Sequence, residues 1–99
     1  MIQKNEILNI LDENKEDIKR LGVKRIGIFG SFVKDRAKTR SDVDVLVEFQ
    51  RGYKSFDNYM ELKAFLEKKF RRKVDLVVKE AVKPRLRLSI FKETIYAGL

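Results

Sequence analysis

The sequence predicts an α/β domain in which helices and strands alternate along the chain. Three short runs rich in β-branched and aromatic residues, 23–30, 43–49 and 73–78, are typical of strands. Stretches with apolar residues at helical spacing lie before, between and after them. Neither an internal repeat nor a linker-like composition interrupts the 99 residues, so we expect one domain over residues 1–99.

The first third of the chain reads as a helix, a strand and a turn. Residues 4–20 carry Ile7, Leu11 and Ile18 near helical spacing, which predicts a first helix. The strand at 23–30 ends at a glycine. Because Ser31 follows this glycine, we expect a junction from strand to helix with Ser31 near the helix N-terminus. Residues 34–40 are expected to form a short helix that runs into a loop.

The rest of the chain repeats this alternation. Strand 43–49 is apolar enough to be central in a sheet, and 50–55 reads as a turn. A long helix is predicted from Asp57, as N-cap, to near Lys69. After strand 73–78, Pro84 suits the first turn of a last helix. That helix is expected to bury three residues, namely Leu88, Phe91 and Ile95.

Composition excludes several kinds of chemistry. The chain has no cysteine and no histidine. Disulfide scaffolds, Cys/His zinc sites, Ser-His-Asp triads, cysteine nucleophiles and histidine bases are therefore excluded. No apolar stretch approaches the roughly 20 residues of a membrane span, and the N-terminus lacks the features of a signal peptide. We therefore expect a soluble, cytoplasmic protein that makes no membrane contact.

The positive charge is concentrated in the last third of the chain. The net charge is +8, and residues 68–92 contain ten Lys and Arg against two acids. Such a block favours an anionic partner, which could be a nucleotide, a nucleic acid or an acidic protein surface, and a solvated surface explains it about equally well. Because aromatic residues for base stacking are not interleaved with these cations, we do not expect a nucleic acid as a specific ligand.

Three aspartates predict a metal site. Asp42 and Asp44 are two residues apart at the entrance of a strand, so their side chains point to the same face. Asp75 lies within the last predicted strand, between apolar residues, where a lone buried carboxylate would need a partner. If the two strands are neighbours, the three carboxylates call for a bound cation, and hard oxygen ligands select Mg²⁺ or Mn²⁺.

The glycine-serine pair that follows the first strand predicts the other half of a site. Gly30 lets a phosphate approach the backbone, and the Ser31 hydroxyl and neighbouring N–H groups can bind phosphate oxygens. Two metal ions beside such a cradle would promote in-line displacement at phosphorus. Taken singly, each feature has a plainer explanation: a helix cap for Gly30-Ser31, a solvated turn for Asp42 and Asp44, and an edge-strand charge for Asp75.

Taken jointly, these residues resemble a known family. Gly30-Ser31, the segment 41–47 (SDVDVLV) and the segment 73–77 (KVDLV) look like the minimal nucleotidyltransferases (MNT) of the DNA polymerase β superfamily. The resemblance covers nearly the whole chain, since 52–53 (GY) and 83–87 (KPRLR) are similar too. It implies a small mixed β-sheet flanked by helices, with ATP as substrate and two Mg²⁺ ions as cofactors.

The resemblance also implies roles for individual residues. Asp42 and Asp44 would bind both metals, and Asp75 would bind the catalytic metal and help to activate the acceptor hydroxyl. Gly30 and Ser31 would hold the β- and γ-phosphates. Two positions depart from the family pattern: Lys34 stands where arginine is common, and Asp35 where glycine is common. Lys34 can still neutralise a phosphate, although not through the paired hydrogen bonds of arginine.

Small stand-alone members of this family are similar to antitoxins whose partner is a HEPN-domain ribonuclease toxin. The resemblance implies a protein adenylyltransferase that transfers AMP from ATP to a tyrosine of the toxin, with which it would assemble. Two alternatives remain open at this point. The chain could be a non-catalytic antitoxin that masks its toxin, or it could transfer nucleotides to RNA or to a small molecule.

Overall fold

The structure is a computed structural model that describes residues 2–98. Within these residues a four-stranded mixed sheet forms in the order β3-β2-β1-β4. Its strands are β1 (Val23–Phe29), β2 (Val43–Phe49), β3 (Val74–Val78) and β4 (Ile95–Tyr96). Strand β2 is antiparallel to β1 and parallel to β3, and β4 is antiparallel to β1. The predicted α/β class and the three predicted strands are confirmed, and β2 is central as expected.

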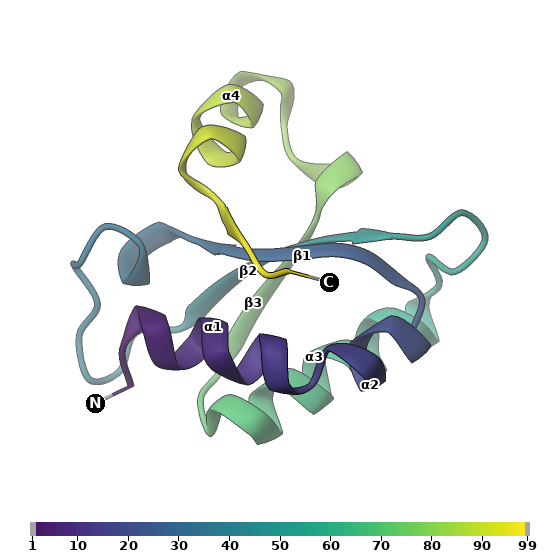
Figure 1. Ribbon diagram of the computed structural model, residues 1–99. Coiled ribbons are helices and arrows are strands. Elements are labelled where there is room, and N and C mark those ends of the chain that lie inside the picture. The colour runs from purple at the N-terminus through teal and green to yellow at the C-terminus, as the bar shows by residue number, and fades with distance from the viewer. Residues whose placement is uncertain (1, 99) are drawn as a thin grey trace.

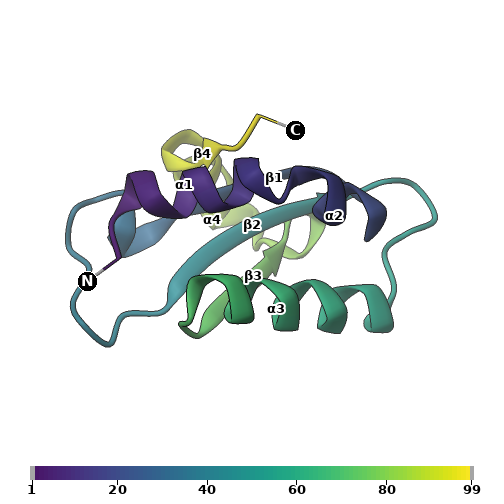
Figure 2. The same cartoon turned by 60° about the horizontal axis from the view of Figure 1, so that its bottom comes forward.

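The helices divide between the two faces of the sheet. They are α1 (Lys4–Glu13), α2 (Lys15–Arg20), α3 (Phe56–Phe70) and α4 (Pro84–Glu93), with 3₁₀ turns η1 (Gly30–Phe32) and η2 (Lys79–Ala81). Figure 1 shows α1, α2 and α3 below the sheet and α4 alone above it. In the turned view of Figure 2, α1 and α3 run along the same face, and residues of the two helices are in contact. Within residues 2–98 no helix is long and apolar enough to cross a membrane.

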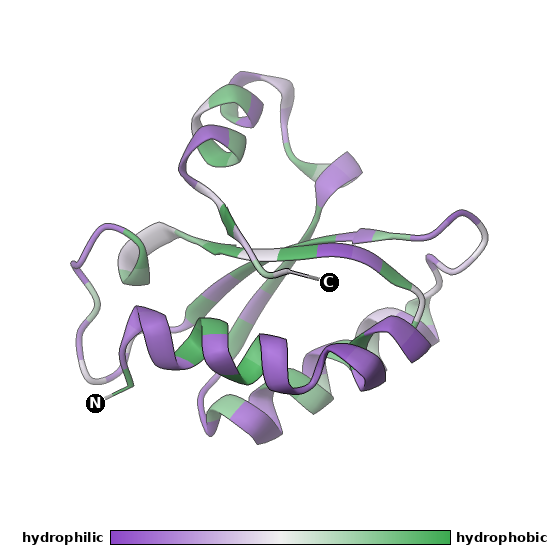
Figure 3. Ribbon diagram, in the orientation of Figure 1, coloured by the Kyte–Doolittle hydropathy of each residue, from purple (hydrophilic) through white to green (hydrophobic). Residues whose placement is uncertain are grey.

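The alternation of side chains along the strands separates two clusters of apolar residues. Val43, Val45 and Val47 of β2 belong to the main core, which the buried residues of α1 and α3 complete. Leu46 points to the opposite face and packs in a smaller cluster with Phe29. In Figure 3 the helices below the sheet carry green, apolar segments among purple, hydrophilic ones. The smaller cluster has far fewer buried residues than the main core, so the α4 face has a much smaller apolar cover than the other face.

The helix predicted over residues 4–20 is divided at Asn14, which ends α1 and precedes α2. The Asn14 side-chain amide donates to the carbonyl of Ile10 at 2.8 Å. A side-chain hydrogen bond of this kind competes with the helical backbone bonds and favours a break. The short helix predicted within 34–40 is absent, and only the loop into which it was expected to run is present, because these residues form turns and irregular structure. Asp35 has φ 56°, which is incompatible with a right-handed helix.

Helix α3 begins and ends close to the predicted bounds, but its cap is a different residue. Ser55 is the N-cap, and its hydroxyl accepts a hydrogen bond from the Asn58 N–H at 3.1 Å. Asp57, the predicted cap, lies in the first turn, where its charge favours the helix dipole.

Replacing Ser55 by alanine should lower the free energy of unfolding by about 1 kcal/mol, because the Asn58 N–H loses its acceptor. Asp57→Asn should lower it by about half as much, since only a dipole interaction is lost. Urea denaturation of both variants measures the difference. A larger loss for Asp57→Asn would show that the sequence-based assignment of the cap was right.

The last helix opens at Pro84 as predicted, and Phe91 packs on the smaller cluster as predicted, but Leu88 does not. Leu88 is 80% exposed. Leu88 precedes Ile90 by two residues, so the two side chains point in nearly opposite directions on a helix. Ile90, together with Phe91, packs on the smaller cluster. Ile95 lies beyond the helix in β4, where it pairs with Ile28 of β1.

Candidate active site

Two of the three predicted aspartates lie side by side at one end of the sheet. Asp44 of β2 and Asp75 of β3 are partners in the register of the parallel pair. Their carboxyl groups are close enough to hydrogen-bond each other. The sequence predicted a shared site only if the strands that carry Asp44 and Asp75 are neighbours. They are, and they bring together residues that are far apart in the chain.

The third aspartate lies just before β2, close enough for its charge to act on Asp44. Asp42 is two residues before Asp44, and Leu46 is two residues after it. Because side chains alternate along a strand, Asp44 is directed to the same face as Leu46, which is the α4 face that Leu46 helps to cover, and Asp42 lies one residue before this strand begins. The negative charge of Asp42 acts on Asp44. The acidic site therefore lies on the face opposite to α1, α2 and α3.

The carboxyl group of Asp44 has an unusual affinity for protons. Its pKa is raised from the usual 3.8 to about 6, first by its partial burial and then by the negative charges of Asp75 and Asp42. The hydrogen bond with Asp75 acts in the same direction. The Ser31 backbone N–H donates to Asp44 and opposes the rise. A bound cation would neutralise such a group of carboxylates.

Gly30 is the residue that lets the turn after β1 approach these acids. It has φ 75°, in the left-handed region that favours glycine. A Cβ atom at this position would collide with Oδ2 of Asp44 and lie 2.9 Å from its Cγ. Phe29, the preceding residue, is the register partner of Asp44 in β1. The predicted contact between the glycine-serine turn and the acids is therefore present in the structure.

The expected helix after Gly30 is absent. The 3₁₀ turn η1 contains only residues 30–32, so no helix begins at Ser31. The Ser31 N–H, expected as a free donor to a phosphate, instead donates to the Asp44 carboxylate. The close approach of Asp44 explains this, because a carboxylate is a strong acceptor for a neighbouring amide.

Asp75 is exposed, so the cost of burying a lone carboxylate does not arise at this position. Strand β3 lies at the edge of the sheet. Within residues 2–98 no charged side chain is buried. The position of Asp75 beside Asp44, rather than the expense of burying it, is what joins it to the site. An exposed charge on an edge strand also discourages aggregation, so this plainer role is compatible with the structure.

Lys34 is held by a residue that the sequence did not single out. Its Nζ atom lies 3.1 Å from Oε2 of Glu93, at the end of α4. The Lys34 side chain is half exposed and that of Glu93 is largely covered. The pair ties α4 to the turn after Gly30, to whose carbonyl the Lys34 N–H donates at 3.1 Å. No local pattern could have found Glu93, because its partner lies 59 positions earlier in the chain.

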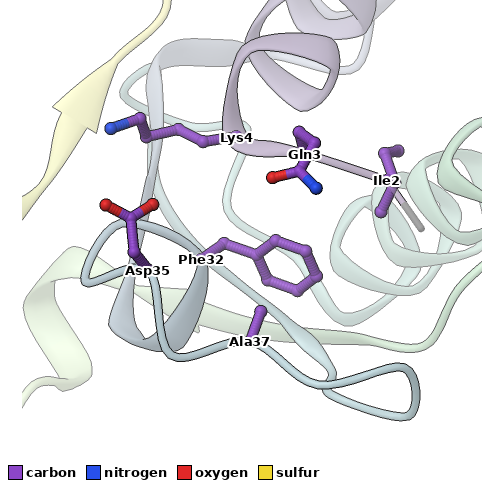
Figure 4. Close-up of a pocket in the computed structure, with 6 residues that line it drawn as sticks. All are labelled: Ile2, Gln3, Lys4, Phe32, Asp35 and Ala37. Atoms are coloured by element: carbon purple, nitrogen blue, oxygen red, sulfur yellow. The ribbon is translucent and has the colours of Figure 1, made fainter.

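Asp35, which departs from the family pattern, lies away from the acids. It occupies the left-handed region, which aspartate tolerates better than most residues. Figure 4 shows its carboxyl group on the side of Lys4, at a small cavity of 90 Å³ also lined by Phe32. Lys4 belongs to α1, on the face opposite to the acids. Asp35 therefore takes the backbone conformation for which glycine is suited and directs its charge toward α1.

The carboxylate oxygens of the three aspartates suit a hard cation, although the side chains are not already arranged around one. Among residues 2–98 no three Asp, Glu, His or Cys side chains are gathered closely enough to hold a metal by themselves. Carboxylates repel one another when no cation is between them, and Mg²⁺ sites commonly use one or two carboxylates together with substrate phosphates. The adjacent Asp44 and Asp75, with Asp42 nearby, fit a site of that kind.

The comparisons with known proteins agree with this geometry. The nucleotidyltransferase domain family matches residues 6–97. A protein adenylyltransferase, MntA, of Thermococcus cleftensis is 38% identical over 97 residues, which cover 97% of each chain. A solved structure provisionally assigned as a minimal nucleotidyltransferase is 33% identical, with a TM-score of 0.73 over 89% of this chain and 93% of that one.

More distant solved structures share the fold. One is a toxin-antitoxin structure with AMP-PNP (TM-score 0.67, 21% identity, 96% of this chain and 72% of that one). Another is a tri-AMPylated HEPN toxin of Shewanella oneidensis in complex with its MNT antitoxin (TM-score 0.62, 16% identity, 90% and 70%). With the acids, the glycine-serine turn and the mixed sheet in place, the chain belongs to the nucleotidyltransferase domain family, on its minimal nucleotidyltransferase branch.

Proposed function

We propose that this chain is an antitoxin that transfers AMP from ATP to a tyrosine hydroxyl of a HEPN-domain ribonuclease toxin, with release of pyrophosphate. The observation that carries the proposal is the pairing of Asp44 and Asp75 beside Gly30 on one end of the sheet. The name of the 38% identical relative supports adenylyl transfer to a protein. The folds shared with toxin-antitoxin complexes support the partner.

The three aspartates are assigned to two Mg²⁺ ions. Their oxygen atoms are the ligands that magnesium prefers, and the pKa of Asp44 is raised by its partial burial and by the negative charges of Asp75 and Asp42, which bound cations would neutralise. When bound, the ions would neutralise the phosphates and bring the attacking and leaving oxygens into line. We assign Asp42 and Asp44 to both ions and Asp75 to the ion nearer the acceptor.

We place the two substrates on opposite sides of the pair formed by Asp44 and Asp75. Gly30 and Ser31 lie on the β1 side of Asp44, where we place the β- and γ-phosphates of ATP. Lys34 adds positive charge on this side and would exchange its contact with Glu93 for a phosphate oxygen. Asp75 lies on the β3 side, where we place the tyrosine hydroxyl.

The transfer is a single displacement at the α-phosphorus. The tyrosine oxygen forms a bond to the α-phosphorus of ATP, and the bond from that phosphorus to the bridging oxygen breaks. Pyrophosphate leaves with the electron pair of that bond. The hydroxyl proton passes to the Asp75 carboxylate and from there to solvent, which the exposure of Asp75 permits.

The test is transfer of label from α-labelled ATP to the HEPN-domain protein encoded in the neighbouring reading frame, in magnesium buffer. The parent chain should label the partner, and Asp75→Asn should reduce the rate by at least about 100-fold. Asp57→Asn, which removes an exposed carboxylate from α3 on the other face, is the matched control and should label at the parental rate. Equal rates for the parent chain and Asp75→Asn would refute the proposal.

Two other outcomes would select the alternative functions. If Asp75→Asn abolishes transfer but still neutralises the toxin fully in cells, masking alone would account for the antitoxin activity. If RNA or a small molecule takes up the label and the partner protein does not, the chemistry would stand and the acceptor would be different.

A further inference from the structure

The chain holds an anion of its own beside the turn to which the β- and γ-phosphates are assigned. The Lys34 ammonium lies 3.1 Å from Oε2 of Glu93. The other two lysine ion pairs found within residues 2–98 both involve Glu48 and are longer, at 3.5 and 3.8 Å. Among these residues neither Lys34 nor Glu93 takes part in a second ion pair. The two side chains therefore form an isolated pair.

Lys34 is attached firmly to the glycine-serine turn. Its backbone N–H donates to the Gly30 carbonyl at 3.1 Å, and the Val33 N–H donates to the same carbonyl at 3.1 Å. The side chain starts three residues after Ser31 and is 50% exposed. A phosphate bound at this turn would therefore find the Lys34 ammonium within reach.

Glu93 is placed by the elements on either side of it. It is the last residue of α4, and the Thr94 that follows caps the helix. The backbone N–H and the hydroxyl of Thr94 both donate to the Ile90 carbonyl, at 3.1 and 2.6 Å. The next residue, Ile95, is already paired with Ile28 of β1. The backbone at Glu93 is thus held between a capped helix and a paired strand.

A glycine in β1 allows this segment to lie close to the strand. A Cβ atom at Gly27 would be 2.8 Å from Cγ2 of Thr94 and 2.7 Å from the carbonyl oxygen of Ile95. Both distances are shorter than van der Waals contact. The same strand leads directly to Gly30. The fold therefore brings Glu93 to the turn, and the ion pair is more than a chance encounter of two long surface side chains.

The two partners of the pair differ in how well water solvates them. The Glu93 side chain is 19% exposed, against 50% for Lys34. A carboxylate that is largely covered depends on its cation more than an exposed one does. A phosphate that took Lys34 would leave Glu93 without a counterion and close to a second anion, which it would repel. Binding of a phosphate at Lys34 and retention of Glu93 there therefore oppose each other.

We propose that Glu93 is a positioning residue that competes with the phosphates of the nucleotide for Lys34 and takes Lys34 back as pyrophosphate leaves. This inference rests on the proposed function, which assigns the β- and γ-phosphates to the turn after Gly30. Lys34 passes from Glu93 to a phosphate oxygen when ATP binds, and from pyrophosphate to Glu93 when the product departs. Neither exchange makes or breaks a covalent bond.

The competition matters most for the product. ATP has an α-phosphate and an adenosine unit with which to make further contacts, whereas pyrophosphate has only its phosphate oxygens. Glu93 is already held at the site by the fold, so it loses no freedom of association when it takes Lys34, and a free phosphate does. The built-in carboxylate therefore keeps pyrophosphate from occupying the site after transfer.

The first experiment measures binding to the chain alone, by calorimetry in magnesium buffer. The two ligands are pyrophosphate and an ATP analogue in which a CH₂ group replaces the oxygen that bridges the α- and β-phosphates. Glu93→Gln keeps the size of the side chain and removes its charge. The affinity for both ligands should rise at least about threefold, because Lys34 no longer has to be displaced from a carboxylate.

Glu80→Gln is the matched control. Glu80 is an exposed residue of η2, shortly before α4, and takes part in none of the ion pairs found within residues 2–98. The control removes the same charge without freeing Lys34, so both affinities should stay at the parental value. Loss of a partly exposed ion pair costs little stability, and urea denaturation should show that Glu93→Gln is folded. Glu93→Ala is a second variant that removes the carboxylate.

A double variant separates competition for Lys34 from direct repulsion of the ligand. Lys34→Met removes the ammonium and keeps an unbranched side chain. In the Lys34→Met background, Glu93→Gln should raise the affinity for pyrophosphate by less than about twofold, because only screened repulsion remains.

The label-transfer assay provides a kinetic readout. Glu93→Gln should lower the KM for ATP at least about threefold without raising kcat, and pyrophosphate should inhibit this variant at concentrations lower by a similar factor. A purely structural role of Glu93 at the end of α4 would raise KM or lower the stability, and would not strengthen binding.

The possible results separate this inference from the proposed function. If the parent chain binds both ligands and Glu93→Gln binds them no more tightly, the inference is wrong and the proposed function stands. An equal gain in the Lys34→Met background, or an equal gain for Glu80→Gln, would also overturn it, because the effect would then be one of general charge. A parent chain that binds neither ligand in magnesium buffer would refute the proposed function, and this inference with it.

Discussion

Gly30→Ala should destabilise the protein by about 3 kcal/mol and reduce AMP transfer at least about 100-fold. Two effects combine. Alanine at φ 75° adopts the left-handed region with a penalty of about 1 kcal/mol, and its Cβ collides with the Asp44 carboxyl group. Either Asp44 leaves its place beside Asp75 or the turn after β1 moves. Both movements separate the glycine-serine turn from the acids.

Gly52→Ala is the matched control for the backbone effect. Gly52 has φ 86°, but a Cβ there would meet no atom within 4 Å. We therefore expect a loss of only about 1 kcal/mol in the free energy of unfolding and an unchanged rate of transfer. Thermal unfolding and the label-transfer assay measure both quantities. If the two alanine variants behaved alike, the close approach of Gly30 to Asp44 would have no functional meaning.

Asp44→Asn should abolish transfer and, in metal-free buffer, stabilise the fold. The amide keeps an oxygen that can accept from the Ser31 N–H and gains a donor toward Asp75, while the repulsion among the carboxylates decreases. Loss of a proposed metal ligand should lower the rate by at least about 100-fold. The variant separates the role of this charge in catalysis from its effect on stability.

The sign of the pH dependence follows from the direction of the pKa shift. The pKa of Asp44 is about 6 in the folded protein against 3.8 ordinarily, so the fold binds this proton more tightly than the unfolded chain does. Stability of the parent chain should therefore fall as the pH rises from about 4 to about 6, and stay low above that range. At pH 8, Asp44→Asn should be more stable by about 1 kcal/mol, a value reduced for solvent screening.

Urea denaturation at pH 4 and pH 8 in the presence of a chelator provides the measurement. The gain for Asp44→Asn should be present at pH 8 and absent at pH 4. Asp12→Asn, which changes an exposed carboxylate on α1, is the control and should show no such difference. A variant that is less stable than the parent chain at pH 8 would contradict the assigned repulsion among the acids.

The strands and the acids were predictable because their signals are local. Residues 43–49 and 74–78 are runs of β-branched residues, which suit few structures other than buried strands. The spacing of Asp42 and Asp44 fixes a shared face through the period of two, whatever surrounds the strand. The close approach of Gly30 to Asp44, by contrast, was predicted only because the glycine-serine pair and the three aspartates were considered together; each of these motifs is weak by itself.

The errors have two physical origins, which are local hydrogen bonding or backbone conformation and packing partners that lie far along the chain. Asn14 and Asp35 interrupt helices through their own hydrogen bonding and backbone conformation. Leu88 was expected to be buried because it fits a helical pattern, yet the α4 face offers only a small apolar cluster, which Ile90 and Phe91 already cover.

By itself, the sequence determined the α/β class, the central strand and the acidic side chains of the candidate site. It could do so because the alternation of side chains along a strand and the residue preferences of turns depend on only a few neighbouring residues. Only the tertiary structure decided that Asp75 is an exposed edge residue beside Asp44 and that Glu93 holds Lys34. These relations join segments that are distant in the chain, and they exist only when the strands have paired and the helices have packed on them.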